Sequence, residues 1–277
     1  MKCLYHANCN DGLAAAMAVW LAHPDMLPRD FVPVQYGSEP PWDVIQDQDV
    51  VIVDFWYKRV WIQAIHLRAR SLLVLDHHAS AERELEGLDC VVFDMNASGA
   101  VLAWNHFHPN EPIPDLFLYV QDRDLWRNEL SDSQAVTMYL RSWTQDLRTW
   151  RWLMSVPVER MVQEGKPILR WYEQERDRLV AAWREKPVYG EIAGWRVPMI
   201  NVPGFMVSDI AGELAVGHPF AVGYFHVADG VVFSLRRRVG DLDLSEVAAS
   251  LGGGGHAAAA GFKKDLGHLV KALGESD

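Results

Sequence analysis

The sequence contains few cysteines: Cys3, Cys9 and Cys90 are the only ones among 277 residues. An odd count without a C-x-x-C pair indicates neither a disulfide framework nor a structural zinc site. The longest apolar stretch, Leu13 to Ala22, directly follows Asp11 and falls short of the ~20 residues that span a bilayer. We therefore expect a buried helix there, reduced thiols, a cytoplasmic location and no membrane partner.

Positive charge is also scarce. Lys and Arg number 26 against 37 Asp and Glu, which gives a net charge of −11. Affinity for duplex nucleic acid depends largely on neutralising phosphates, so this balance argues against a duplex partner. It leaves room for a short anionic substrate held by metal ions or by a local basic patch. A hydrophobic fraction of 49% with 23% charged residues indicates a folded globular chain, long enough for two domains.

The first half of the sequence alternates between strand-like and helix-like patterns. Short apolar runs at Lys2–Tyr5, Val50–Val53 and Leu72–Leu75 predict strands. The stretches Leu13–His23 and Trp61–Arg70 predict helices between them. Strands that alternate with helices are typical of an α/β domain with a mostly parallel sheet.

The second half changes character twice. From Ser133 to about Lys186 the pattern is helical and rich in tryptophan, and Pro219–Arg237 predicts two strands joined by an Asp229-Gly230 turn. We predict two α/β domains, of which the second is smaller, with a helical connector. The predicted boundaries are 1–140 for the first domain, 141–192 for the connector and 193–277 for the second domain.

Polar side chains follow each predicted strand of the first half. Because ligands bind beyond the carboxyl ends of strands in such sheets, we expect these side chains to lie near one another. A further acidic stretch, Asp122 to Asp124, follows the apolar run Leu116–Val120. Carboxylate and imidazole ligands of this kind suit a two-metal hydrolase. The residues after the strands are His6 and Asp11, then Asp54, then Asp76, His77 and His78.

Five polar or glycine-rich segments follow one another along the chain: Tyr5–Gly12, Val53-Asp54, Asp76-His77-His78, Asp122-Arg123-Asp124 and Gly252–Phe262. In this order they resemble the motifs of the DHH phosphoesterases and of the DHH-associated domain. The resemblance implies a catalytic domain that binds two divalent ions, usually Mn²⁺, with Mg²⁺ or another ion as alternatives. It also implies a C-terminal substrate-binding domain and a cleft between the domains. Members of the family include RecJ-like exonucleases, oligoribonucleases, cyclic-dinucleotide phosphodiesterases and exopolyphosphatases.

The resemblance also assigns roles to residues of the first domain. Asp54 and Asp76 are bridging or flanking carboxylates, and both are candidate catalytic residues. His77 contacts a metal directly, whereas His78 assists the substrate phosphate or the leaving group. Asp122 is favoured over Asp124 as the fourth-motif ligand. The predicted metal ligands are His6, Asp11, Asp54, Asp76, His77 and Asp122.

One position departs from the family pattern. Cys9 or Asn10 stands near the place of the first aspartate of the first motif. A Cys9 thiolate would be a softer ligand that suits zinc better than manganese. The alternative is that Cys9 is a small buried residue beside a site that lacks one ligand. The sequence leaves both interpretations open.

The glycine-rich segment of the second domain predicts anion binding. Consecutive glycines let backbone N–H groups approach a phosphate, and we expect the alanines after them to begin a helix whose N-terminus favours an anion. Arg236 follows the strand-like Phe233-Ser234-Leu235 in the manner of the family's substrate-binding strand. The predicted substrate-binding residues are Arg236, Gly253, Gly254, Gly255 and His256.

The leading functional hypothesis is metal-dependent hydrolysis of short oligonucleotides or dinucleotides, such as linear pGpG, to nucleoside monophosphates. Two alternatives remain: a phosphoanhydride hydrolase that acts on polyphosphate or pyrophosphate, and a nucleotide sensor without catalysis. Most of the twelve tryptophans are expected in the core. Trp56, Tyr57 and Trp126 follow predicted ligands and are candidates for stacking on a base. The base specificity, and whether the chain forms a homodimer, are left open.

Overall fold

The computed structural model describes residues 1–265 of the chain. It divides into two compact units, Met1–Arg170 and a second unit that begins at Trp171. Both units combine helices with a sheet, as predicted, whereas the three predicted domain boundaries stay a prediction. In residues 1–265 we find no helix with the length and apolarity needed to cross a membrane.

The first unit is built on a five-stranded sheet in the order β2-β1-β3-β4-β5, and all of its pairings are parallel. Its central strands are the three apolar runs predicted from the sequence. The edge strands β2 and β5 are short and carried no comparable pattern. The strands are β1 (Lys2–His6), β2 (Phe31–Val34), β3 (Asp49–Val53), β4 (Ser71–Asp76) and β5 (Val91–Phe93).

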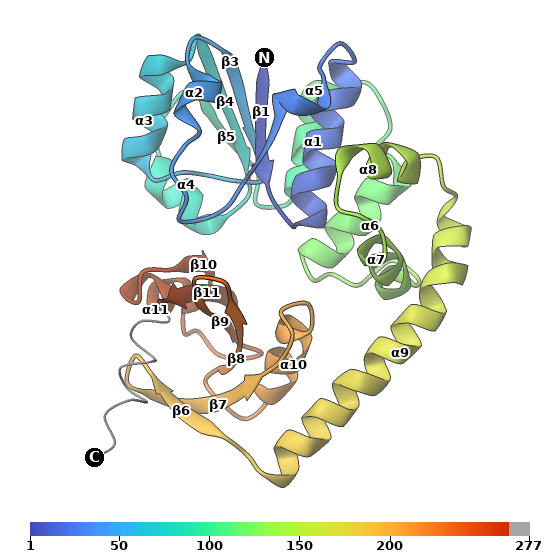
Figure 1. Cartoon of the computed structure of the whole chain (residues 1–277), viewed down its shortest axis with the longest axis vertical. Helices are drawn as coiled ribbons and strands as arrows, with labels where there is room; N and C mark the ends of the chain where they lie inside the picture. The colour runs from blue at the N-terminus through green and yellow to red at the C-terminus, as the bar shows by residue number, and fades with distance from the viewer. Residues whose placement is uncertain (266–277) are drawn as a thin grey trace. The chain divides into compact units, whose positions relative to one another are not determined.

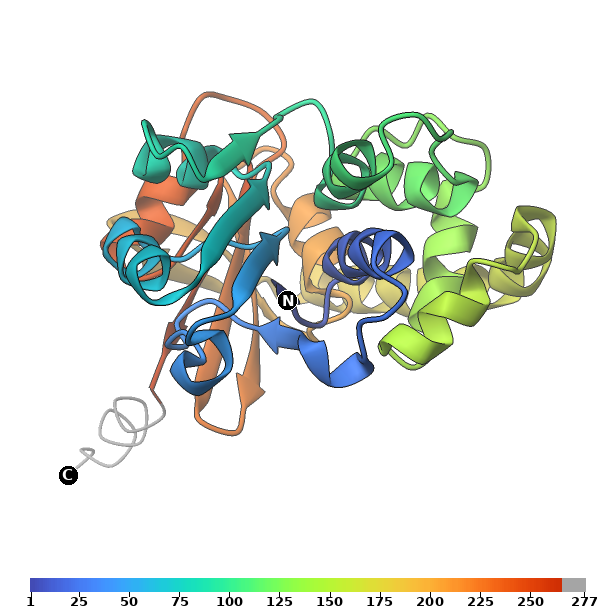
Figure 2. The same ribbon diagram turned by 90° about the horizontal axis from the view of Figure 1, so that it is seen from above.

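Helices cover both faces of this sheet (Figure 1). Strand residues alternate between the faces: Val51 and Val53 pack in one core with α1 and α5, whereas Val50 and Ile52 pack in another with α2, α3 and α4. Figure 2 shows α1, in dark blue, beside one face. These elements are α1 (Asn10–Ala22), η1 (Pro28–Asp30), α2 (Trp42–Ile45), α3 (Arg59–Arg68), α4 (Ala79–Leu85) and α5 (Gly99–Phe107).

The acidic stretch that contains Asp122 and Asp124 lies at the end of a helix. The sequence interpretation placed it with the strand ends, but the apolar run before it belongs to α6 (Asp115–Asp124). Here Leu116, Phe117 and Val120 are buried at helical spacing. Three further helices follow: α7 (Ser133–Arg141), α8 (Leu147–Leu153) and α9 (Val158–Glu185), and α9 runs from the first unit into the second.

The second unit contains a six-stranded mixed sheet in the order β10-β11-β9-β8-β7-β6. The predicted hairpin is present, since β8 and β9 pair antiparallel across Ala228 and Asp229. Its strands are β6 (Tyr189–Ile192), β7 (Trp195–Asn201), β8 (Ala221–Val227), β9 (Gly230–Arg236), β10 (Gly254–His256) and β11 (Ala259–Lys264), and its further helices are α10 (Val207–Leu214) and α11 (Leu244–Ser250).

The prediction of a helix after the glycines was wrong. Ala257 and Ala258 form a turn, and the remaining alanines belong to β11, which pairs with β10 on one side and β9 on the other. Small residues fit here because a Cβ at Gly253 would stand 2.0 Å from the Gly261 carbonyl oxygen. Ala259 and Ala260 are therefore strand residues, and the alanine run provides no helix N-terminus for a phosphate.

Candidate metal centre

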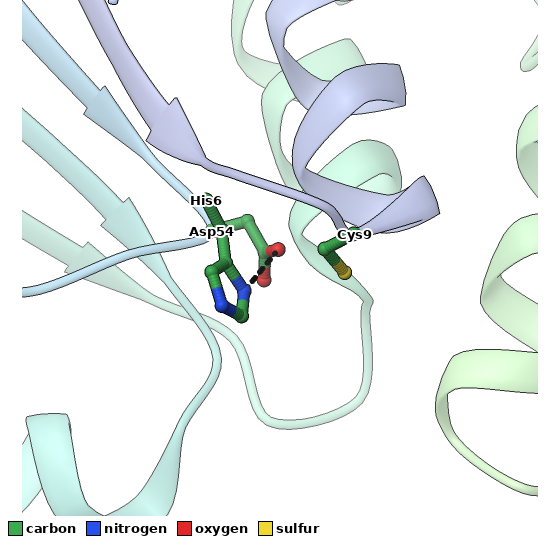
Figure 3. A group of neighbouring side chains, drawn as sticks. All are labelled: His6, Cys9 and Asp54. Carbon is green, nitrogen blue, oxygen red and sulfur yellow. Dashed lines mark ion pairs between the residues drawn. The ribbon is translucent and has the colours of Figure 1, made fainter. Parts of the chain in front are cut away.

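The carboxyl ends of the central strands bring the predicted ligands of the first unit together. His6 is the last residue of β1, Asp54 follows β3 directly, and Asp76 ends β4 ahead of His77 and His78. Asp54 has a left-handed backbone (φ 52°), a conformation that Asp tolerates better than most residues. Figure 3 shows the His6 imidazole and the Asp54 carboxylate pointing toward one another.

Seven side chains at this edge have ligand atoms within reach of shared cations. In each of three overlapping groups the ligand atoms all lie within 4.8 Å of one another. Asp54 belongs to two groups and His77 to two, so the groups form one continuous arrangement. We call it the edge cluster. The groups are His6, Cys9 and Asp54; then Asp54, His77 and His78; then Asp11, His77 and Asp124.

His77 lies at the centre of the edge cluster. Its Nε2 is 3.2 Å from Asp54 Oδ1, 3.6 Å from Asp11 Oδ2 and 3.6 Å from Asp124 Oδ2. Ligands bound ~2.0–2.2 Å from one ion stand roughly 3–3.5 Å apart, so these separations are close to those of a coordination shell. The His77 side chain is 3% exposed, which shields these interactions from water.

Asp11 also holds the start of α5. Its Oδ2 accepts a hydrogen bond from the Gly99 N–H at 2.6 Å, and its Oδ1 accepts one from the Ala100 N–H at 3.0 Å. Gly99 is required here, since a Cβ would stand 2.5 Å from the Asp54 Cβ. Sequence reasoning missed this link, because it joins segments 88 residues apart.

Asp76 orients His78. Its Oδ1 accepts hydrogen bonds from the backbone N–H and from Nδ1 of His78, both at 2.7 Å. Asp76 is fully buried, and it belongs to none of the three ligand groups found among residues 1–265. Asp76 was predicted to be a metal ligand like His77. The hydrogen bonds that it accepts here are those of a residue that orients an imidazole.

The fourth motif contributes Asp124 to the edge cluster instead of Asp122. Asp122 Oδ1 accepts hydrogen bonds from the backbone N–H groups of Glu129 (2.8 Å) and Leu130 (3.3 Å). The two aspartates are two positions apart on α6, so they point to different sides of the helix. The geometry thus favours the alternative that the sequence interpretation ranked second.

Burial and mutual repulsion shift the titration of the edge cluster. Burial, and then the charges of Asp124 and Asp54, raise the pKa of Asp11; burial also raises the pKa of Asp124. Burial acts to raise the pKa of Asp54, but the neighbouring imidazoles of His6 and His77 outweigh it and lower that pKa. Burial disfavours charged His77, but Asp54, Asp11 and Asp124 raise its pKa to about 10. Without a cation, bound protons and a positively charged His77 thus neutralise part of the negative charge of these carboxylates.

The donor set fits divalent cations. It combines three carboxylates, three imidazoles and one thiol in a largely buried site. Asp54 Oδ2 is buried and accepts no hydrogen bond within residues 1–265, although it lies 3.4 Å from His6 Nδ1. Unsatisfied buried oxygens are costly unless a ligand or ion completes them. The edge cluster therefore has the composition and the unmet electrostatic need of a metal centre.

The predicted substrate-binding residues of the second unit lie on the β9–β11–β10 part of its sheet. Arg236 ends β9, where its Nη1 donates to the Leu235 carbonyl and its Nη2 to Ser208 Oγ, both at 2.7 Å. His256 ends β10, and Gly254 and Gly255 precede it in the same strand. Gly253 leads into that strand. Arg236 on β9 and His256 on β10 thus lie on the two strands that flank β11. Their role in binding stays a prediction.

Tyr36, which sequence reasoning missed, lies beside the edge cluster. Its ring centroid is 5.2 Å from that of His6, 6.1 Å from that of His78 and 4.5 Å from that of Phe55. Tyr36 is 45% exposed. Of the aromatic candidates named from the sequence, Tyr57 is buried and Trp126 is exposed beneath the Arg123 guanidinium. No sequence pattern linked Tyr36 to the site, because its loop follows the unpredicted strand β2.

Comparison with known proteins gives one relative by sequence, and no family model matches the chain. The chain is 26% identical over 282 residues to the uncharacterized protein R106 of Acanthamoeba polyphaga mimivirus, matching 94% of this chain. It spans 66% of the length of that relative.

Solved structures are similar over nearly the whole chain. The pGpG-specific phosphodiesterase PggH of Vibrio cholerae is 15% identical with a TM-score of 0.52, covering 99% of this chain and 97% of that one. RecJ of Thermus thermophilus in complex with Mn²⁺ is 14% identical with a TM-score of 0.52, covering 96% of this chain and 49% of that one. The chain shares its fold with these two proteins. At these identities the likeness establishes the two-part α/β architecture that the motifs implied, and leaves the subtype undetermined.

Proposed function

We propose that this protein is a metal-dependent phosphodiesterase that hydrolyses dinucleotides or short oligonucleotides to nucleoside monophosphates. The observation that carries the proposal is the edge cluster, in which Asp11, Asp54 and Asp124 converge on His77 within 3.6 Å. The DHH fold that the chain shares with the PggH phosphodiesterase supports the same reaction class. Mn²⁺ is the proposed ion, as in the RecJ complex.

The chain's own residues have separable roles in this reaction. Asp11, Asp54, His77 and Asp124 would hold the ions, which supply a water of lowered pKa and neutralise the scissile phosphate when bound. Asp54 occupies the shared position of two ligand groups, as a bridging carboxylate requires. Asp11 fixes the adjacent N-terminus of α5 through its two hydrogen bonds, so its orientation is set before any ion binds.

His78 is the proposed proton donor. Asp76 accepts a hydrogen bond from its Nδ1 at 2.7 Å, and burial of the ring is outweighed by the charge of Asp76, which raises the pKa of His78. With Nδ1 bonded to Asp76, Nε2 is the atom that would donate a proton to the leaving oxygen. The ring stands within the same ligand group as Asp54 and His77, so it lies next to the reacting phosphate in this proposal.

An exposed aromatic ring at the edge cluster favours a nucleotide over polyphosphate. Polyphosphate offers no base, so a site for it has no need of a stacking surface. Tyr36 is 45% exposed and rests on Phe55 beside His6 and His78. Stacking of a base on an aromatic side chain contributes ~1–3 kcal/mol. We therefore propose that Tyr36 supports a base next to the scissile bond.

The testing experiment compares three substrates. Purified protein is incubated with and without Mn²⁺ with a 5′-phosphorylated dinucleotide, a 20-mer and polyphosphate, and products are separated by chromatography. We expect Mn²⁺-dependent loss of the dinucleotide, fastest of the three. Tyr36→Ala should raise KM for the dinucleotide by roughly 5- to 150-fold, the equivalent of that stacking energy, and Tyr36→Phe should restore it.

Other outcomes would redirect the proposal. Loss of polyphosphate alone, unaffected by Tyr36→Ala, would indicate a phosphoanhydride hydrolase. A dinucleotide that binds but is recovered intact would indicate a sensor. Faster degradation of the 20-mer would indicate an exonuclease for longer strands.

A further inference from the structure

Cys9 belongs to one of the three ligand groups of the edge cluster, together with His6 and Asp54. Its Sγ lies with a nitrogen of His6 and an oxygen of Asp54, all within 4.8 Å of one another. The three residues come from the loop before α1, the end of β1 and the turn after β3. Figure 3 shows the Cys9 thiol on that loop, across from the facing His6 and Asp54 side chains.

A second observation points to a ligand at this position. Asp54 is 1% exposed, and its Oδ2 accepts no hydrogen bond within residues 1–265; its contact with His6 Nδ1, at 3.4 Å, is an ion pair only when that imidazole is protonated. A buried carboxylate oxygen in this state is costly unless something positive completes its shell. Asp54 Oδ1, by contrast, is already 3.2 Å from His77 Nε2. The unsatisfied oxygen is therefore the one on the side of His6 and Cys9.

A purely structural role for Cys9 is poorly supported. Cys9 is the N-cap residue of α1, where Ser, Thr, Asp and Asn are preferred because their side chains accept a backbone N–H. Its side chain makes no capping hydrogen bond. Nor is it part of either hydrophobic core of the first unit, in contrast to the fully buried Cys3. Its thiol faces charged residues, where an apolar side chain gains little.

We propose that Cys9 is a thiolate ligand of a metal position completed by His6 and Asp54, and that this position prefers a borderline ion such as Zn²⁺, Co²⁺ or Fe²⁺ over Mn²⁺ or Mg²⁺. The inference rests on the proposed metal-dependent function and refines the ion at one position. On binding, the S–H bond of Cys9 breaks, the sulfur–metal bond forms and the proton passes to the buffer.

Ligand softness gives the preference. Mn²⁺ and Mg²⁺ favour oxygen ligands, whereas thiolate and imidazole together suit Zn²⁺ and its neighbours. The group of Asp11, His77 and Asp124 offers two carboxylates and one imidazole and contains no sulfur. This group and the Cys9 group therefore favour different ions, and we expect the loaded protein to hold a mixed pair of ions.

Co²⁺ tests the ligand directly, because a thiolate–cobalt bond gives a charge-transfer absorption in the near ultraviolet that oxygen and nitrogen ligands do not. We expect this band on titration of the metal-free protein with Co²⁺. Cys9→Ser should abolish the band and weaken Co²⁺ or Zn²⁺ binding at least about tenfold. Cys90→Ser is the matched control, since Cys90 lies outside every ligand group found in residues 1–265, and it should leave the band unchanged.

Cys9→Asp provides a second, opposite prediction. It places a carboxylate where sulfur stands, so the ratio of Mn²⁺ to Zn²⁺ affinity should rise at least about tenfold while the cobalt band disappears. A Co²⁺ complex with no charge-transfer band, or equal metal affinities in the wild type, Cys9→Ser and Cys9→Asp, would overturn the proposal.

These results are distinguishable from the fate of the proposed function. Hydrolysis of the dinucleotide without a sulfur–cobalt band would refute the Cys9 ligand and keep the phosphodiesterase. A band without hydrolysis of any substrate, under Mn²⁺, Zn²⁺ or Co²⁺, would keep the ligand and refute the phosphodiesterase.

Discussion

The two units differ in the partners of their ionisable side chains. At the strand ends of the first unit, ionisable side chains face one another: His77 Nε2 lies within 3.6 Å of three carboxylates. In the second unit, Arg236 donates to the Leu235 carbonyl and to Ser208 Oγ, and Arg237 Nε donates to the Ala257 carbonyl. The first arrangement gathers charge that its own contacts leave incompletely satisfied, whereas the second ties cationic side chains to the fold.

This difference distinguishes side chains that are placed to bind a ligand from side chains that hold the fold together. Concentrated buried carboxylates cost stability in the absence of a cation, so their presence indicates a ligand that the chain itself does not supply. Arg236 and Arg237 of the second unit each donate hydrogen bonds to the fold, and a phosphate could share them. Mutations in the first unit should therefore change chemistry and metal binding most, and those in the second should change substrate affinity.

The largest expected effect is that of Asp54→Asn. Asn keeps the left-handed backbone at this position and the side-chain volume, but it removes the charge shared by two ligand groups. Hydrolysis of the dinucleotide should fall at least about 100-fold, beyond the range seen for residues that only orient ligands. Activity close to wild type, in a variant with an unchanged circular dichroism spectrum, would contradict the assignment of the edge cluster.

A matched pair on α6 tests the choice between two aspartates. Asp124→Asn should lower Mn²⁺ affinity and hydrolysis by at least about tenfold, because it removes the negative charge of a carboxylate 3.6 Å from His77. Asp122→Ala should cost ~1–3 kcal/mol of stability, because the N–H groups of Glu129 and Leu130 lose their acceptor. Metal titration and thermal unfolding of both variants measure this, and exchanged phenotypes would restore Asp122 as the ligand.

Metal binding should stabilise the protein through the first unit. An ion at 100 times its dissociation constant adds ~2.7 kcal/mol, equivalent to a rise of roughly 5–10 °C in Tm for a domain of this size. Calorimetry with Mn²⁺ and with a chelator measures the shift. Asp54→Asn should show little of it, and an equal shift in that variant would place the ion elsewhere.

Much of the fold could be predicted because its central strands are continuous apolar runs that end in polar residues. The ends of β1, β3 and β4 located His6, Asp54 and His77 within one site. The sequence could not distinguish Asp124 from Asp122, because the choice depends on the orientation of α6 and on a loop that caps Asp122.

Other features depended on packing between distant segments. The alanines after the glycines have good helix propensity, but the first two form a turn, and pairing with β9 and β10 makes Ala259 and Ala260 part of a strand. Tyr36 and the contact between Asp11 and Gly99 involve elements without a recognisable motif. Tertiary contact decided each of these, and a single sequence carries little trace of it.

A smaller effect is expected from Arg236→Gln in the second unit. If Arg236 contacts a substrate phosphate, loss of its charge should raise KM for the 5′-phosphorylated dinucleotide about tenfold, roughly 1.4 kcal/mol, with little change in kcat. Arg237→Gln is the control, since its guanidinium bonds the Ala257 carbonyl and no substrate role is proposed for it. Steady-state kinetics of both variants decide the matter, and equal KM values would leave Arg236 with a structural role only.

The smallest effect should come from a carboxylate of the first unit that is fully satisfied by the fold. Asp146 caps α8, where its Oδ1 accepts hydrogen bonds from the N–H groups of Arg148 and Thr149 and its Oδ2 accepts one from the Thr149 hydroxyl. Burial acts to raise the pKa of Asp146, but these hydrogen bonds outweigh it and lower the pKa. Asp146→Ala should therefore cost ~1 kcal/mol at neutral pH and leave hydrolysis unchanged.

The pH dependence of this cap separates it from the edge cluster. A lowered pKa means that the stabilisation is present above the ordinary Asp pKa of about 3.9 and is lost as the pH falls toward the folded-state value. Denaturant unfolding should thus show the ~1 kcal/mol difference between wild type and Asp146→Ala shrinking below about pH 4. If the difference persisted there, the cap would act through packing, not charge. Added Mn²⁺ should leave it unaltered at neutral pH, because Asp146 is outside every ligand group found in residues 1–265. The stabilisation contributed by Asp146 would then depend on pH alone, whereas the stabilisation contributed by the edge cluster would depend on metal.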